Sequence, residues 1–202
     1  MHISDGVLSA PVWIGGYVAA AGIVVATIRK INPEDMPKVA VITSTFFVAS
    51  LIHVPLGPTS VHLVLNGLAG VVLGPMAFVS ILIGLALQAL LFQHGGITTI
   101  GANAVMMGLP ALIAYKIFQQ RKRFNFRSNV AIWGTLAGVS GILFGTPILA
   151  LLLVTTGREF IGVAKYAALA HLPIMAIEGV ITGLVVSFLI RVKPEILEGG
   201  DT

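Results

Sequence analysis

The chain contains no cysteine among its 202 residues, and only 10% of its residues are charged. Disulfides and cysteine-based zinc sites are therefore excluded, and any metal ligand must be a nitrogen, oxygen or thioether donor. The net charge of +4 is too small to indicate nucleic-acid binding. The sequence also lacks a phosphate-binding Gly-Lys-Ser/Thr loop, so any process that requires ATP hydrolysis would need a separate ATPase subunit.

Long apolar segments dominate what is present. Hydrophobic residues make up 56% of the chain and the mean hydropathy is +0.99, which is typical of an all-α polytopic membrane protein. Breaks at polar, Pro and Gly residues predict about seven transmembrane helices, at residues 10–28, 39–56, 60–74, 76–93, 102–118, 130–156 and 166–191. We expect one membrane domain over residues 1–202, with its bundle at 10–191. The short third helix is expected to be tilted, buried or only partly spanning.

The basic residues predict the orientation of these helices. Ten of the twelve Lys and Arg residues lie on one side of a seven-helix arrangement: Arg29, Lys30, Lys38, Lys116, Arg121, Lys122, Arg123, Arg127, Arg191 and Lys193. The positive-inside rule makes that side cytoplasmic, with the amino terminus external and the tail at 192–202 inside. The histidines, which are His2, His53, His62, His94 and His171, then all fall near external ends of their segments. The external half is therefore favoured for imidazole chemistry.

The opening pair Met1-His2 is suited to binding a metal ion. The terminal amine, the His2 amide nitrogen and the imidazole Nδ1 can close a five-membered and a six-membered chelate ring on one ion. Three nitrogens favour nickel(II) and copper(II), with cobalt(II) next. The chelate requires a free, unformylated amine and a retained segment. The first eight residues contain Asp5 but no Lys or Arg, which argues against a cleaved signal peptide.

The metal-chelating segment at residues 1–9 is long enough to reach back into the bundle. We expect the first helix to begin after an N-cap at Ser9, and eight extended residues span about 26 Å. Asp5 and Gly6 are expected to form the turn, with a contact between Asp5 and the metal ligands as the alternative.

A fourth ligand is expected from the stretch between His53 and His62. Its Pro and Gly residues predict a tight turn between the second and third helices. His62 would then lie in the first turn of the third helix, with Asn66 one turn deeper on the same face, and this polar pair favours His62 as the ligand. Thr59 and Ser60 are interpreted as caps of that helix.

Other polar residues within or beside the helices have weaker cases. His53 and His94 rank below His62 as ligands, and His171 has no assigned role. Glu178 lies well inside the seventh helix, where we expect a structural hydrogen bond rather than a proton-linked role. Three amides flank the Gly-rich loop at 94–101 and are expected to bind its backbone: Gln88, Gln93 and Asn103.

Three ordered blocks resemble the CbiM/NikM family, the substrate-binding membrane components of energy-coupling-factor cobalt and nickel uptake transporters. The blocks are MHISDG at 1–6, GPTSVHLVLNG at 57–67 and QALLF at 88–92, which leads to the glycines at 95–96 and GAN at 101–103. The resemblance covers essentially the whole chain and implies a seven-helix fold that captures the ion with Met1, His2 and His62. His94 departs from the family pattern, in which an acidic or neutral residue precedes the double glycine.

The resemblance also implies partners: a transmembrane coupling (T) protein, two cytoplasmic ATPase subunits and often a small accessory membrane protein. We therefore expect capture of Ni²⁺ or Co²⁺ from the external side as the substrate component of an ATP-driven transporter, in the plasma membrane of a prokaryote, and no enzyme activity. Candidate neighbours of the metal ligands are Asp5, Asn66, Ser60, His53 and His94. Two alternatives stay open. One is a membrane metalloenzyme with Glu178 as base, which no His-Glu-x-x-His spacing supports; the other is an autonomous metal channel or carrier.

Overall fold

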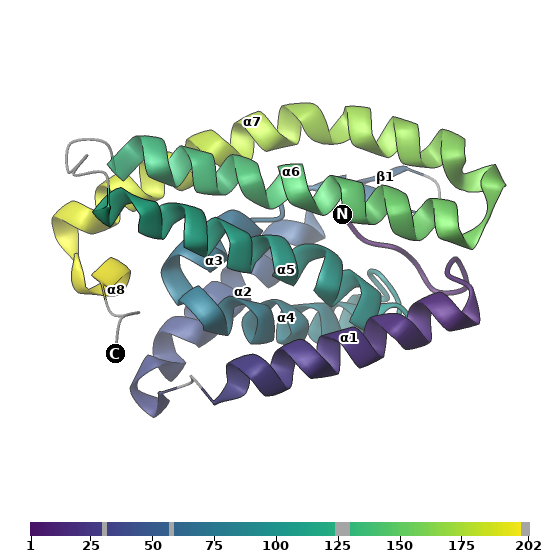
Figure 1. Cartoon of the computed structure of the whole chain (residues 1–202), viewed down its shortest axis with the longest axis horizontal. Coiled ribbons are helices and arrows are strands. Elements are labelled where there is room, and N and C mark those ends of the chain that lie inside the picture. Colours follow the sequence, from purple (N-terminus) through teal and green to yellow (C-terminus); the bar gives the residue numbers. More distant parts are fainter. Residues whose placement is uncertain (30–31, 57–58, 124–129, 199–202) are drawn as a thin grey trace.

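The computed structural model describes residues 1–29, 32–56, 59–123 and 130–198, which form a helical bundle with one short hairpin (Figure 1). The α-helices are α1 Ala10–Ile28, α2 Met36–Leu51, α3 Asn66–Leu73, α4 Ala77–Phe92, α5 Ile100–Gln119, α6 Val130–Thr156, α7 Ile161–Val192 and α8 Glu195–Glu198. The 3-10 turns η1 Pro33–Asp35, η2 Gly74–Met76, η3 Gln120–Lys122 and η5 Arg158–Phe160 adjoin them. The hairpin consists of β1 His53–Leu56 and β2 Thr59–His62.

Five helical stretches of the described chain are long and apolar enough to cross a membrane. They are α1, α6, the joined α3 and α4 at Asn66–Phe92, α5 with η3, and α7 with η5. The multi-pass helical membrane protein predicted from the sequence is thereby confirmed, and α1 and α6 have the predicted bounds. The orientation across the membrane stays a prediction, and two residues used for it, Lys30 and Arg127, lie outside the described part of the chain.

The helices lie side by side, with α5 at the centre of the bundle. Figure 1 shows α6 and α7 along one edge and α1 along the opposite edge. Between these edges α5 packs against α1, α3, α4 and α6. The outward faces of α1 and α7 expose large apolar side chains such as Val18 and Leu184, as expected for helices that contact lipid.

The short helix α3 is buried among its neighbours, one of the arrangements expected for it. All eight of its residues are buried. A Cβ atom at Gly70 would lie 2.0 Å from the carbonyl oxygen of Ala111 in α5, and one at Gly67 would lie 2.6 Å from that of Ala137 in α6. The two glycines therefore allow α3 to touch the backbones of both helices.

The region between α2 and α3 differs from the sequence-based prediction. Residues 53–56 and 60–62, assigned above to the second and third helices, lie in the antiparallel strands β1 and β2, with His53 paired to His62. Pro55 and the β-branched residues around it favour extended backbone over helix. Gly57 and Pro58, which belong to the predicted turn, lie outside the described residues.

The placement of His62 in the first turn of a helix is therefore wrong. His62 ends β2, and α3 begins four residues later at Asn66, so the two side chains do not share a helix face. Leu65 adopts a left-handed conformation with φ of 55° that separates strand from helix. Thr59 and Ser60 are strand residues rather than helix caps.

Candidate metal centre

The amino-terminal segment folds back into the bundle, as its length predicts. It ends before α1, whose N-cap position is Ser9. Met1 is fully buried and His2 is 2% exposed. The Met1 side chain lies against α6, because a Cβ atom at Gly145 would be 3.0 Å from its Sδ atom. The terminal amine consequently lies inside the protein, beside α6 (Figure 1).

The backbone of Ile3 holds the amino-terminal segment against α5. Its N–H donates to Oδ1 of Asn103 at 3.0 Å, and its carbonyl accepts from Nδ2 of the same residue at 3.0 Å. Thr99 donates a further hydrogen bond to that carbonyl at 2.7 Å. Ile3 also forms an isolated antiparallel bridge with Thr59. Asn103 thus binds the backbone of the terminus, whereas the sequence suggested the backbone of the loop.

Asp5 and Gly6 form a turn, as predicted, and Asp5 also ties the turn to the Gly-rich loop. Gly6 has φ of 77°, and the Asp5 carboxylate accepts hydrogen bonds from the N–H groups of Ile97 and Thr98 at 3.0 and 2.8 Å. Partial burial raises the pKa of Asp5, but the hydrogen bonds from Thr98 and Ile97 outweigh it and leave this pKa below its usual value. The contact needs Gly96, where a Cβ atom would lie 2.3 Å from the carboxylate.

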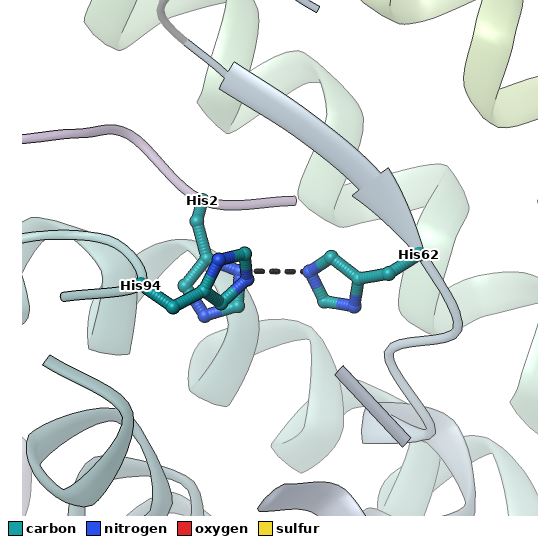
Figure 2. Close-up of side chains that lie close together, drawn as sticks. All are labelled: His2, His62 and His94. Carbon is teal, nitrogen blue, oxygen red and sulfur yellow. Dashed lines mark hydrogen bonds between the residues drawn. The ribbon is translucent and has the colours of Figure 1, made fainter. Parts of the chain in front are cut away.

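Met1 and His2 converge on His62. The Met1 amine lies 2.5 Å from Nε2 of His62, and Nδ1 of His2 lies 2.7 Å from the same atom. Figure 2 shows His62 pointing from the end of β2 towards the ring of His2. The hairpin and the terminal segment therefore bring together the three residues that the sequence singled out as ligands.

A chain of hydrogen bonds fixes the tautomer of His2. The Ser50 hydroxyl donates to the Phe46 carbonyl at 2.5 Å and so accepts from the Gln88 amide at 2.7 Å. The amide oxygen of Gln88 then faces Nε2 of His2 at 2.7 Å, and this nitrogen must carry the ring proton. Nδ1 of His2 is left with a lone pair directed at His62.

His62 is fixed in the complementary way. Its Nδ1 donates to the carbonyl of Leu63 at 2.7 Å, so its Nε2 carries a lone pair. Two neutral imidazoles thus face one another with lone pairs across 2.7 Å. Such an arrangement repels unless a proton or a metal cation lies between the nitrogens, and it is the arrangement that metal-ligating histidines adopt.

Burial favours the neutral forms of the Met1 amine and of the His2 and His62 imidazoles. It lowers the pKa of the Met1 amine well below its usual value, against the opposing influence of Glu178. Burial, followed by the nearby amine, also lowers the pKa values of His2 and His62 well below the usual histidine value. Neutral amine and imidazole groups are the protonation states that bind metal ions.

The distances fit a square of nitrogens. With metal–nitrogen bonds of about 2.0 Å, adjacent corners of a square lie about 2.8 Å apart. Nε2 of His62 is 2.5 and 2.7 Å from the two outer nitrogens of the Met1-His2 chelate. In the chelate the third nitrogen, the His2 amide, would occupy the corner between those two. The two distances are compatible with Nε2 of His62 at the fourth corner of such a square.

His94 joins this cluster, and His53 lies behind it. Three ring nitrogens, one each from His2, His62 and His94, lie within 4.8 Å of one another. Figure 2 shows the rings of His94 and His2 close together, with centroids 4.2 Å apart. The His53 ring lies 4.2 Å from that of His94. Burial, then the neighbouring His53, lowers the pKa of His94 to about 4.

Other candidates lie apart from the cluster or support it indirectly. Asn66 donates to the carbonyls of Met107 and Gly141 and so joins α3 to α5 and α6. Ser60 is buried in β2 with no hydrogen bond from its hydroxyl among the described residues. His171 is buried in α7, where its Nδ1 donates to Ala167 of the same helix and its Nε2 has no hydrogen-bond partner among the described residues. Glu178 accepts the backbone N–H groups of Val64 and Leu65, the structural role expected for it.

Comparison with known proteins identifies the family. The family described as "Cobalt uptake substrate-specific transmembrane region" matches residues 2–196. The chain belongs to this CbiM family. The resemblance stated from the three sequence blocks is thereby confirmed.

Relatives and a solved structure agree with CbiM membership. A "Putative metal transport protein" of Haemophilus influenzae is 34% identical over 201 residues, which cover 98% of this chain and 97% of that protein. A "Putative fused cobalt transport protein CbiMQ" of Methanocorpusculum labreanum is 31% identical, over 100% of this chain and 37% of that protein. A "Putative fused nickel transport protein NikMN" of Archaeoglobus fulgidus is 30% identical, over 98% and 68%. A crystal structure of a truncated transition metal transporter superposes with a TM-score of 0.79 at 28% identity, covering 95% of this chain and 99% of that one.

Proposed function

We propose that this CbiM protein captures Ni²⁺ or Co²⁺ from the external side as the substrate-binding component of an ATP-driven uptake transporter. The observation that carries the proposal is the convergence of the Met1 amine and Nδ1 of His2 on Nε2 of His62. In the proposed complex these three nitrogens and the deprotonated His2 amide hold the ion in a plane. The metal ion is the cargo of the protein rather than a resident cofactor.

The donor set supports a borderline divalent ion. Four nitrogens without a carboxylate or thiolate suit Ni²⁺, Cu²⁺ and Co²⁺ better than Mg²⁺ or Ca²⁺. A planar arrangement of four nitrogens favours Ni²⁺, whereas the description of the family concerns cobalt uptake. Deprotonation of the amide offsets part of the charge of the ion, which makes binding of a cation in this buried place less costly.

The energy for transport would come from other subunits. The chain has no phosphate-binding loop, and the proposal assigns ATP hydrolysis to two cytoplasmic ATPase subunits that act through a transmembrane coupling protein. The fused names of two relatives, CbiMQ and NikMN, support a membrane partner of this kind and a small accessory membrane protein. The positive-inside pattern supports a metal centre on the external side of the plasma membrane of a prokaryote.

Extension of the amino terminus tests the proposal. Two glycines added before Met1 replace the amine with an amide and crowd a fully buried segment, so affinity for Ni²⁺ and Co²⁺ should fall by about 100-fold or more. Two are needed because a single glycine would give Gly-Met-His, which is itself a chelate of four nitrogens. The matched control carries the same two glycines after Thr202. Affinity is measured by competition with a chromophoric chelator, and metal content and the absorption spectrum identify the ion and its geometry. Unchanged affinity in the extended protein would rule out the terminal amine as a ligand.

Two further measurements separate this proposal from its alternatives. His62→Ala should lower the affinity and change the spectrum, because the fourth corner of the square is lost. Proteoliposomes that contain the chain alone should bind but not accumulate the metal. Uptake without an ATPase would indicate an autonomous carrier, and metal-dependent turnover of an added substrate would indicate a metalloenzyme.

A further inference from the structure

Two histidines beside the proposed chelate have no role in it. His53 is exposed at the start of β1, and His94, which follows α4, is 9% exposed. The ring centroids of His53 and His94 are 4.2 Å apart, and those of His94 and His2 are also 4.2 Å apart. A row of three imidazoles therefore runs from the surface of the protein to the buried ring of His2.

Both outer histidines present a nitrogen that can bind a cation. Nδ1 of His53 donates to the Leu51 carbonyl at 3.1 Å, which leaves a lone pair on its Nε2. Nε2 of His94 is buried without a hydrogen-bond partner among the described residues. An unpaired buried nitrogen is costly and calls for an explanation. A ring needed only for packing would be better supplied by phenylalanine.

The row ends where the chelate begins. One nitrogen of His94 lies within 4.8 Å of ligand atoms of His2 and His62, and two nitrogens bound to one ion are at most about 4.2 Å apart. The nitrogens of His94 and His62 are therefore close to the separation at which one ion bridges two ligands. The four corners of the proposed square are already supplied, so His94 is not needed to complete it.

Building on the proposed function, we propose that His53 and His94 form an access path that passes Ni²⁺ or Co²⁺ from external water to the Met1-His2-His62 chelate. The ion exchanges its bound waters for imidazole nitrogens one at a time, first at His53, then at His94, and finally at His62. Stepwise exchange avoids the cost of stripping the hydration shell at once in a buried, largely apolar place. No proton or electron is transferred along the path.

An access path has a kinetic signature that a permanent ligand lacks. A group that only assists passage speeds capture and escape equally, so its removal lowers the association and dissociation rates by one factor and leaves Kd unchanged. We expect His94→Ala and His94→Phe to slow both rates by roughly tenfold or more. His94→Phe keeps a ring between His53 and His2 and removes the nitrogens, which separates ligation from packing. His53→Ala, at an exposed position, should slow the rates without affecting folding.

Stopped-flow measurements on the purified, untagged chain test this proposal. Ni²⁺ binding is followed by absorption, and dissociation is started with excess chelator. Gln120→Ala serves as the control, because that side chain is exposed in η3, bonds to the adjoining helix α5 and lies outside the row. The double variant His53→Ala/His94→Phe should be close to the slower single variant, since both residues act on one path.

Two results would overturn the proposal. Wild-type rates in His94→Phe would show that the ring serves packing alone. A weaker Kd together with a changed absorption spectrum would show that His94 is a permanent fifth ligand. Failure of the proposed function is a separate result: the affinity would then be insensitive to the two added amino-terminal glycines, whereas a failed access path leaves that sensitivity intact.

Discussion

Glu178 of α7 accepts a hydrogen bond from the backbone N–H of Leu65 at 2.8 Å and another from Val64. Both residues lie in the link between His62 and α3, where Leu65 has a left-handed conformation. A side chain 113 residues further along the chain thus completes the hydrogen bonding of the segment that presents His62.

We expect Glu178→Ala to lower stability and metal affinity together. It leaves two buried N–H groups unpaired, at a cost of about 1–3 kcal/mol for each group. Glu178→Gln retains an acceptor oxygen and should have a smaller effect. Thermal unfolding in detergent, with and without Ni²⁺, measures both changes. A stable Glu178→Ala protein with wild-type affinity would contradict the supporting role.

Gln88→Leu should weaken metal binding by about 10–100-fold, because the proton of His2 loses the acceptor that keeps it on Nε2. Gln120→Leu, an exposed change in η3, is the control. Equilibrium competition with a chelator provides the affinity of each variant. Equal affinity of the two variants would show that the tautomer of His2 does not depend on Gln88.

Gly96→Ala should displace the amino-terminal segment, because the new methyl group would lie 2.3 Å from the Asp5 carboxylate. We expect weaker metal binding and faster proteolysis near residues 1–8. Gly22→Ala is a matched control, since nothing lies within 4 Å of its Cβ position. If both variants behave like the wild type, the loop and the segment are not in close contact.

The contact between Asp5 and the loop should weaken in acid. Its hydrogen bonds lower the pKa of Asp5 in the folded protein, so their stabilising contribution is present above the unfolded pKa of about 3.9 and is lost as the pH falls through the folded value. Hydrogen exchange at Ile97 and Thr98, corrected for intrinsic rates, should accelerate below about pH 4. Asp5→Asn should remove this pH dependence.

Metal affinity should rise with pH by close to one logarithmic unit per pH unit around pH 7 to 8. Burial lowers the pKa values of the Met1 amine, His2 and His62, so these groups are already neutral and only the amide of His2 has a proton to release. Chelator competition across this range gives the slope. A slope of about two would mean that the amine is protonated in the metal-free protein.

The sequence predicted the membrane helices better than it predicted the hairpin. α1 and α6 are long, continuous apolar runs, and their length alone distinguishes them from strands. The segment around β1 and β2 is short and apolar, so its periodicity fits either structure. Tertiary contacts favour the strands: Ile3 forms a β-bridge with Thr59, and Glu178 accepts a hydrogen bond from the segment that follows His62.

Within the candidate site, covalent neighbours were easier to assign than distant ones. The three nitrogens of Met1-His2 are close by bond geometry. His62 was selected because it was expected to share a helix face with Asn66, which the hairpin shows to be wrong. The roles of Gln88 and Asn103 depend on partners 86 and 100 residues away, and an amide beside a Gly-rich loop gives little indication of its partner. A polar residue facing inward in α4 was the available signal for Gln88.

The arrangement of donors along the chain also affects how an ion could be released. Three of the four proposed nitrogens belong to Met1 and His2, and the adjacent Ile3 is joined to α5 by two hydrogen bonds with Asn103. A shift of α5 against the terminal segment would withdraw these three nitrogens as a unit and leave the ion attached through His62 alone. One movement of a helix would then break three metal–nitrogen bonds together, rather than one after another.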